Sequence, residues 1–148
     1  MDVNYARLEN LLASSKWRSA DEETSLIILK IANRVDAGWL REQDFAELSC
    51  FNLETIDELW ANHSQGHFGF TAQSQVWKTV GENYTKFSGA VGWRLNHQWQ
   101  MYSQLKFSLE APPGHLPAAP FYKLSDEIAI GWAASLPQKL ADCLDESF

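Results

Sequence analysis

Apolar residues recur with a period of about 3.6 along most of this 148-residue chain, and this pattern restricts the fold more than any other feature. One apolar face runs through residues 5–15, a second through 19–35 and a third through 53–63. No segment shows the alternation of apolar and polar residues that indicates a half-buried strand. A chain of this length can bury roughly two thirds of its unfolded surface as one domain. The sequence therefore predicts a single compact all-α domain of about seven or eight helices.

Capping signals predict where several of these helices begin. Ser19-Ala20-Asp21-Glu22 has the capping-box pattern, so we expect a central helix to begin at Ser19 and to end near Gly38. Thr71 is expected to cap the helix that follows the turn at residues 64–70. Further helices are expected over residues 41–48, 53–63, 81–92 and 93–105, with a last one that begins at Ser125 and is bent or restarted at Pro137.

The charge of the chain excludes one class of partner. Its formal net charge is −7 and its sequence pI is about 5.0, whereas a nucleic-acid-binding surface needs clustered lysine and arginine. The longest apolar run, Leu26–Leu29, is far too short to cross a bilayer, and the N-terminus has no signal or transit pattern. We therefore expect a soluble, cytoplasmic monomer, at most peripheral at membranes, with no nucleic-acid partner.

Neither the cysteines nor the histidines predict a reactive site. Cys50 and Cys143 form no CxxC pair, so we expect both as reduced thiols in a cytosol-like compartment. His63 and His67 have the i,i+4 spacing of a helical metal pair, but Gly66 lies between them and no HExxH motif is present. The simpler interpretation is one histidine at a helix end and one in a turn. We expect neither a bound metal nor catalysis.

Three irregular segments carry bulky apolar groups where turns usually carry small polar ones. They are "SQGHFGF" (Ser64–Phe70), "GAVGWR" (Gly89–Arg94) and "APPGHLP" (Ala111–Pro117). The last lies in a proline-rich stretch, residues 106–123, that is too long for a simple connection. The side chains of these segments either cover the core or build a concave apolar surface for a flat aromatic ligand. The residues alone leave both interpretations open.

Five motifs occur together in the order found in the "genomes uncoupled four" family, which the chain resembles over residues 8–120. The motifs are "WRSADEET" (17–24), "IDELW" (56–60), "SQGHFGFTAQSQVW" (64–77), "VGWR" (91–94) and "APPGHLP" (111–117). The resemblance implies one tetrapyrrole-binding domain over residues 1–148, shaped like a cupped hand, with 121–148 as a C-terminal helical segment. It further implies a protein that binds protoporphyrin IX and Mg-protoporphyrin IX and regulates magnesium chelatase in chlorophyll synthesis, without being an enzyme. Its implied partner is the large porphyrin-binding subunit of that chelatase.

The resemblance also implies where the ligand lies. In such proteins the porphyrin occupies a groove under two mobile loops, which correspond here to residues 38–51 and 91–120. Trp93 is then expected as a loop aromatic against the macrocycle, and Arg94 and Lys123 as cations at the propionate edge. The implied ligand contacts are Phe45, Phe51, Val91, Trp93, Arg94, His115, Leu116 and Lys123.

Some positions depart from the family pattern. His67 stands where the family has arginine, Asn52 replaces the aspartate of the "CxDL" motif, and Lys123 is the one basic residue shortly after "GHLP". A different propionate clamp follows, so a bilin also remains open as ligand, as does an interaction module that has lost its ligand. In the family, "GRFGF" belongs to the helical framework, and we therefore expect Phe68 and Phe70 to pack inward.

Overall fold

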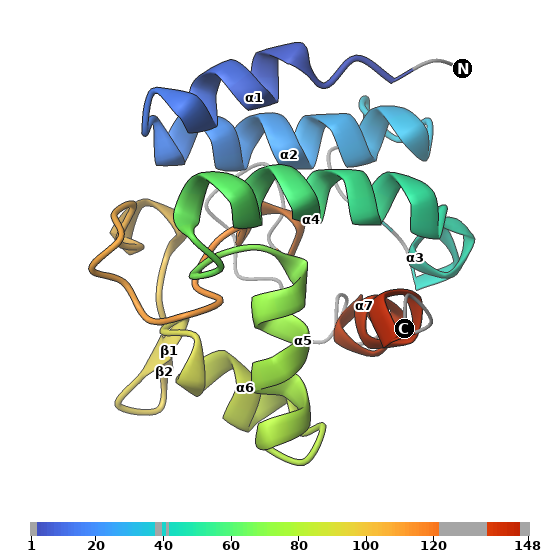
Figure 1. The fold of residues 1–148 in the computed structure, drawn as a ribbon. Coiled ribbons are helices and arrows are strands. Elements are labelled where there is room, and N and C mark those ends of the chain that lie inside the picture. The colour runs from blue at the N-terminus through green and yellow to red at the C-terminus, as the bar shows by residue number, and fades with distance from the viewer. Residues whose placement is uncertain (1–2, 38–39, 41, 122–135, 146–148) are drawn as a thin grey trace.

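The structure, a computed structural model, describes residues 3–37, 40, 42–121 and 136–145. It is mostly helical, as predicted, and its elements are shown in Figure 1. The α-helices are α1 (Ala6–Ala13), α2 (Trp17–Ile31), α3 (Glu42–Glu47), α4 (Cys50–Ser64), α5 (Phe70–Thr79), α6 (Tyr84–Ala90) and α7 (Leu136–Asp145). The short strands β1 (Arg94–Leu95) and β2 (Gln98–Trp99) pair antiparallel, and the 3₁₀ turns are η1 (Tyr102–Gln104) and η2 (Ala119–Phe121).

Helices α1, α2 and α4 form one layer of the molecule (Figure 1). Helix α1 packs against both α2 and α4, while α5 and α6 run across this layer and carry the β-hairpin at one end (Figure 1). Helix α7 lies against α5, α4 and α3. The hairpin and α3 therefore lie at opposite sides of the molecule (Figure 1).

Aromatic side chains fill the core between these layers. Trp60 of α4 is fully buried, packs against Trp17 and Phe68, and donates from Nε1 to Thr24 Oγ1 at 2.9 Å. Phe70 is fully buried as well. The prediction that both phenylalanines of "SQGHFGF" pack inward is thus confirmed. A fully buried aromatic side chain contributes about 3 kcal/mol relative to an exposed one, so this cluster stabilises the helical layer substantially.

The predicted start of the central helix is wrong. Helix α2 begins at Trp17, two residues before Ser19, and its N-cap residue makes no side-chain capping bond. Asp21 does not serve a capping box, because it is fully buried and bonded to residues far along the chain. The helix also ends earlier than expected, at Ile31, and Val35 beyond it is exposed. Gly38 lies outside the described residues.

The predicted cap of α5 is wrong for a related reason. The helix begins at Phe70, with Gly69 as N-cap in a conformation of φ +111°. Asp57 of α4 accepts hydrogen bonds from Thr71 N at 2.8 Å and Thr71 Oγ1 at 2.6 Å. A carboxylate from a neighbouring helix therefore accepts a hydrogen bond from a backbone N–H in the first turn of α5, which has no partner within the helix.

Residues 93–105 do not form the predicted helix. The chain makes the β-hairpin instead, and its turn residues Asn96 and His97 both have positive φ, as a tight hairpin turn requires. Trp93, at the start of this segment, is fully buried in the core. The last helix, predicted from Ser125, begins among the described residues at Leu136, with Pro137 in its first turn, where proline is tolerated.

The two cysteines are not the reduced thiols that we expected. Cys50 at the start of α4 and Cys143 in α7 form a disulfide, with 5.2 Å between their Cα atoms. They are 93 residues apart in sequence, so no short spacing indicates the pair. Packing of α7 on α4 brings the two cysteines together. The spacing of cysteines in a sequence does not reveal such a contact between distant helices.

Candidate functional site

The turn "SQGHFGF" lies directly beside the segment "APPGHLP". Gly114 N donates to the His67 carbonyl at 2.9 Å, and Gly69 N donates to the Leu116 carbonyl at 3.0 Å. His67 also forms a hydrogen bond through Nε2 with the carbonyl of Ala111. Two motifs that are far apart in sequence thus form one hydrogen-bonded unit.

His115 joins the segment "VGWR" to this unit. Its ring is buried, with Nδ1 2.6 Å from the Val91 carbonyl and Nε2 accepting from Lys106 N at 3.0 Å. Since a backbone N–H occupies Nε2, the proton must lie on Nδ1, which donates to Val91. Burial lowers the pKa of His115, in keeping with this neutral form. Both ring nitrogens are therefore used in holding the loops together.

Asp21 and Gln73 fasten the same segment to the helices beneath it. Asp21 Oδ1 accepts from Ala118 N and Ala119 N, both at 3.0 Å, and Oδ2 accepts from Tyr102 Oη at 3.0 Å. The Gln73 amide donates to the Gly114 and Pro117 carbonyls. Desolvation of its carboxyl group raises the pKa of Asp21 to about 7, although its three donors favour the charged form.

We call residues 64–70, 91–94 and 106–121, with their anchors Asp21 and Gln73, the loop frame. Four of the predicted ligand contacts meet inside it: Val91, Trp93, His115 and Leu116. Trp93 is fully buried, packs edge-on against Phe87 and donates from Nε1 to the His115 carbonyl at 2.8 Å. Trp93 does lie in the loop between α6 and β1, but its ring is buried in the core, and its contact with a ligand stays a prediction. Arg94, at the edge of the frame in β1, is half-buried.

Phe51 lies in a different part of the molecule. It belongs to the first turn of α4, next to α3 and across the molecule from the hairpin (Figure 1). Its side chain is 72% exposed, more than any other large apolar side chain of the described residues. Phe45 lies in α3, and Lys123 lies outside the described residues. We call α3, the first turn of α4 and α7 the α7 side; the structure does not bring its Phe51 together with the four buried contacts.

The α7 side has its own set of connections. Arg34, beyond the end of α2, pairs with the buried Asp44 of α3 at 3.4 Å. Lys139 of α7 donates to the carbonyl of Ala46 in α3 at 3.0 Å. The Cys50–Cys143 disulfide joins α7 to α4. Phe45 and Phe51 of this region are predicted ligand contacts, whereas no feature of the sequence predicted its disulfide.

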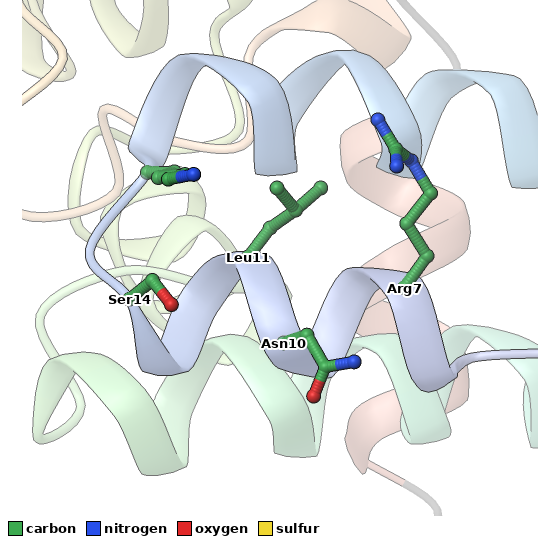
Figure 2. A pocket seen from close by; sticks show the side chains of 5 residues that line it. Arg7, Asn10, Leu11 and Ser14 are labelled. Atoms are coloured by element: carbon green, nitrogen blue, oxygen red, sulfur yellow. The ribbon is translucent and has the colours of Figure 1, made fainter.

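A hollow that sequence reasoning did not predict lies between α1 and the start of α2 (Figure 2). It has a volume of about 380 Å³ and is lined by Arg7, Asn10, Leu11, Ser14 and Lys16. No aromatic side chain lines it, and Arg7 is already paired with Glu23 at 3.4 Å. Leu11 is the one apolar side chain among the described residues of this lining, which is too little to cover a broad apolar ligand face. The hollow therefore does not suit a flat aromatic ligand.

The described residues contain no group of three or more histidine, cysteine, aspartate or glutamate side chains placed to hold a metal ion. No helix among them is long and apolar enough to cross a membrane.

Comparison with known proteins decides the family. The sequence model of the GUN4-like family matches residues 1–129 of the chain. The chain belongs to this family. The GUN4 resemblance of the five motifs is thereby confirmed, and the loop frame is where most of those motifs meet.

Named relatives of this GUN4-family chain occur in plants and algae. It is 34% identical over 122 residues to "Tetrapyrrole-binding protein, chloroplastic" of Arabidopsis thaliana, a match that covers 74% of this chain and 46% of that protein. It is 33% identical over 118 residues to "Uncharacterized protein ycf53" of Pyropia yezoensis, covering 78% of this chain and 50% of that protein. The chain thus spans about half the length of the curated relatives it matches.

Solved GUN4 structures share the fold. The ligand-free structure of Arabidopsis thaliana GUN4 matches with a TM-score of 0.74 and 28% identity, covering 93% of this chain and 90% of that one. The structure of GUN4 from Chlamydomonas reinhardtii matches with a TM-score of 0.75 and 24% identity, covering 95% and 88%. The helical architecture of Figure 1 is therefore that of the family.

Proposed function

We propose that this protein binds a tetrapyrrole and regulates magnesium chelatase in chlorophyll synthesis, acting as a carrier and regulator rather than as a catalyst. The observation that carries the proposal is family membership together with a relative at 34% identity that is named for tetrapyrrole binding. Protoporphyrin IX and Mg-protoporphyrin IX are the proposed ligands, with a bilin as the alternative because His67 and Asn52 depart from the family pattern. The large porphyrin-binding subunit of the chelatase is the proposed partner.

Exposure of the predicted contacts divides their roles in this proposal. A porphyrin has two broad apolar faces. They can pack directly only on apolar side chains that are exposed on the protein surface before the ligand binds. Phe51 meets this requirement and is the side chain that we propose as the leading direct contact. Phe45, in the adjacent helix α3, is proposed as a second contact. Val91, Trp93, His115 and Leu116 are buried and hydrogen-bonded, so they would act as a rigid support unless the frame opens.

Arg94 and Lys123 are the proposed partners of the propionates if the ligand lies at the loop frame instead, because Arg94 belongs to β1, across the molecule from the start of α4 that carries Phe51 (Figure 1). Arg94 is half-buried and, among the described residues, takes part in no ion pair. A guanidinium in that state can form bidentate hydrogen bonds to a carboxylate without first breaking an existing pair.

A titration tests the proposal. The chain contains seven tryptophans, so their emission should be quenched when a tetrapyrrole binds. We expect saturable quenching by protoporphyrin IX, Mg-protoporphyrin IX or a bilin at micromolar concentration. A micromolar dissociation constant corresponds to a binding free energy of about −8 kcal/mol. A chelatase assay with and without the protein then tests regulation, with an expected rise in rate. Absence of saturable quenching by all three ligands would contradict the proposal and favour an interaction module that has lost its ligand.

A further inference from the structure

The Cys50–Cys143 disulfide occupies a distinctive place in the fold. It joins α7, the last described helix, to the first turn of α4. Cys50 immediately precedes Phe51, the most exposed large apolar residue described. The bond lies outside the loop frame, which is held by hydrogen bonds among its own loops and anchors. Breaking the bond would therefore act first on the α7 side.

Apart from this bond, packing and a few polar contacts hold α7. Its inner face buries Leu140, Ala141 and Leu144 against the helices around it. Among the described residues, Lys139 donates to the Ala46 carbonyl at 3.0 Å and Trp77 Nε1 donates to Gln138 at 3.4 Å. A helix of ten residues is only marginally stable by itself in water, so its order depends on these attachments.

The two cysteine residues differ in their exposure to solvent. Cys143 is 2% exposed, whereas Cys50 is only partly buried. Thiol–disulfide exchange needs an attacking thiolate to reach one sulfur in line with the bond. Because Cys50 is the accessible partner, a reductant would attack its Sγ and displace the sulfur of Cys143.

We propose that the Cys50–Cys143 disulfide is a redox-controlled clasp, which holds α7 against α3 and the first turn of α4 until a protein dithiol reduces it. Reduction loosens α7 and so alters the surface around Phe51. The reductant's first thiolate forms a mixed disulfide with Cys50, and Cys143 leaves as a thiolate that takes up a proton. The second thiol of the reductant then attacks the reductant's own sulfur in the mixed disulfide, and Cys50 leaves as a thiolate that takes up a proton. Two electrons and two protons pass from the dithiol to the protein, which ends with two thiols while the reductant ends as a disulfide.

Hydrogen exchange in the oxidised and reduced 148-residue chain tests the clasp without any ligand. We expect amide exchange in α3 and α7 to rise at least tenfold on reduction, with no change in α1 and α2. The double variant Cys50→Ser, Cys143→Ser should match the reduced protein. Equal exchange in both redox states would overturn the proposal, and so would a uniform rise across the whole chain, since that would identify a general stabilising cross-link.

Single-cysteine variants test the direction of attack. In Cys143→Ser the remaining Cys50 should react with iodoacetamide at least tenfold faster than the remaining Cys143 does in Cys50→Ser. Similar rates, or a faster Cys143, would contradict attack at Cys50. Each variant is the matched control of the other, because both lack the disulfide.

A porphyrin titration tests the effect on the ligand surface, a part of the inference that rests on the proposed function. We expect the dissociation constant of protoporphyrin IX to change at least threefold between the oxidised protein and the double variant. Equal constants, with the exchange difference present, would overturn control of binding. If neither form binds porphyrin, the proposed function and its control by the clasp both fail, while the exchange result still decides the clasp itself.

Discussion

In the loop frame, motif residues are buried and joined by hydrogen bonds, whereas on the α7 side apolar packing, a disulfide and a few polar contacts hold α3 and α7 beside the exposed Phe51. The motifs that make this family recognisable are thus mainly residues that fold the chain. Buried polar side chains such as Asp21 and His115 tolerate few substitutes because each satisfies several partners. An exposed side chain such as that of Phe51 has no such constraint from the fold.

Trp93→Ala should produce the largest effect. The substitution removes a fully buried ring, its packing on Phe87 and its bond to the His115 carbonyl, and should lower the free energy of unfolding by about 3–5 kcal/mol. Urea denaturation measures it. The half-buried Trp99 provides the control, since Trp99→Ala should cost clearly less. A loss below about 1 kcal/mol for Trp93→Ala would mean that the frame does not depend on this ring.

Asp21 should give the frame a pH dependence. Burial raises the pKa of Asp21 from 3.8 in the unfolded chain to about 7. Between these values the folded protein holds a proton that the unfolded chain has lost, so stability falls as pH rises through this window. About three pKa units at about 1.4 kcal/mol each give about 4 kcal/mol.

The variant Asp21→Asn isolates this contribution. Its neutral side chain keeps an acceptor for Ala118 N and Ala119 N, so the stability difference between variant and wild type should grow in the variant's favour from pH 4 to pH 7. His115 acts in the opposite direction, because its lowered pKa makes stability fall as pH drops below 6.5, but it cancels in this difference. A constant difference across the range would show that Asp21 is ionised throughout.

Gly69→Ala should test the junction of α4, α5 and the frame. Gly69 has φ +111°, and an added Cβ would lie 2.8 Å from Asp57 Oδ1. Strain and displacement of Asp57 should together cost about 3 kcal/mol. Gly66 is the matched control in the same turn, with φ +79° and open space around an added Cβ, so Gly66→Ala should cost about 1 kcal/mol. Equal losses in thermal unfolding would indicate that backbone strain alone matters.

Arg94→Ala tests the alternative position of the ligand at the loop frame. If Arg94 binds a propionate, the variant should lose about 1–2 kcal/mol of affinity for a dicarboxylate porphyrin and little for its diester. Tryptophan quenching with both porphyrins, on wild type and variant, measures the difference. Equal losses for the two ligands would remove Arg94 from the binding site.

Local patterns in the sequence predicted the parts of the fold that depend on local interactions. Apolar periodicity identified α1, α4 and α5, and the inward packing of Phe68 and Phe70 followed from the family motif. Two of the errors share one physical cause, which is contact between residues that are distant in sequence. Asp57 supplies the cap that Thr71 was expected to provide, and α7 brings Cys143 to Cys50.

The same cause limited prediction of the candidate site. The motifs indicated that Val91, Trp93, His115 and Leu116 act together, and the structure places them together. Their burial could not be predicted, because it results from bonds between the "VGWR" and "APPGHLP" segments. The sequence also could not reveal that Phe51 stands apart from them on the α7 side.

The most direct test of the account compares Phe51→Ala with Leu109→Ala in protoporphyrin IX titrations. Both side chains are exposed, so neither substitution should change the free energy of unfolding by more than about 0.5 kcal/mol. Since Leu109 lies in the loop frame, we expect its loss to leave affinity unchanged. The loss of Phe51 should weaken binding by about 1–2 kcal/mol, or roughly five- to thirtyfold. Unchanged affinity in Phe51→Ala, or weaker binding only in Leu109→Ala, would contradict a ligand surface on the α7 side.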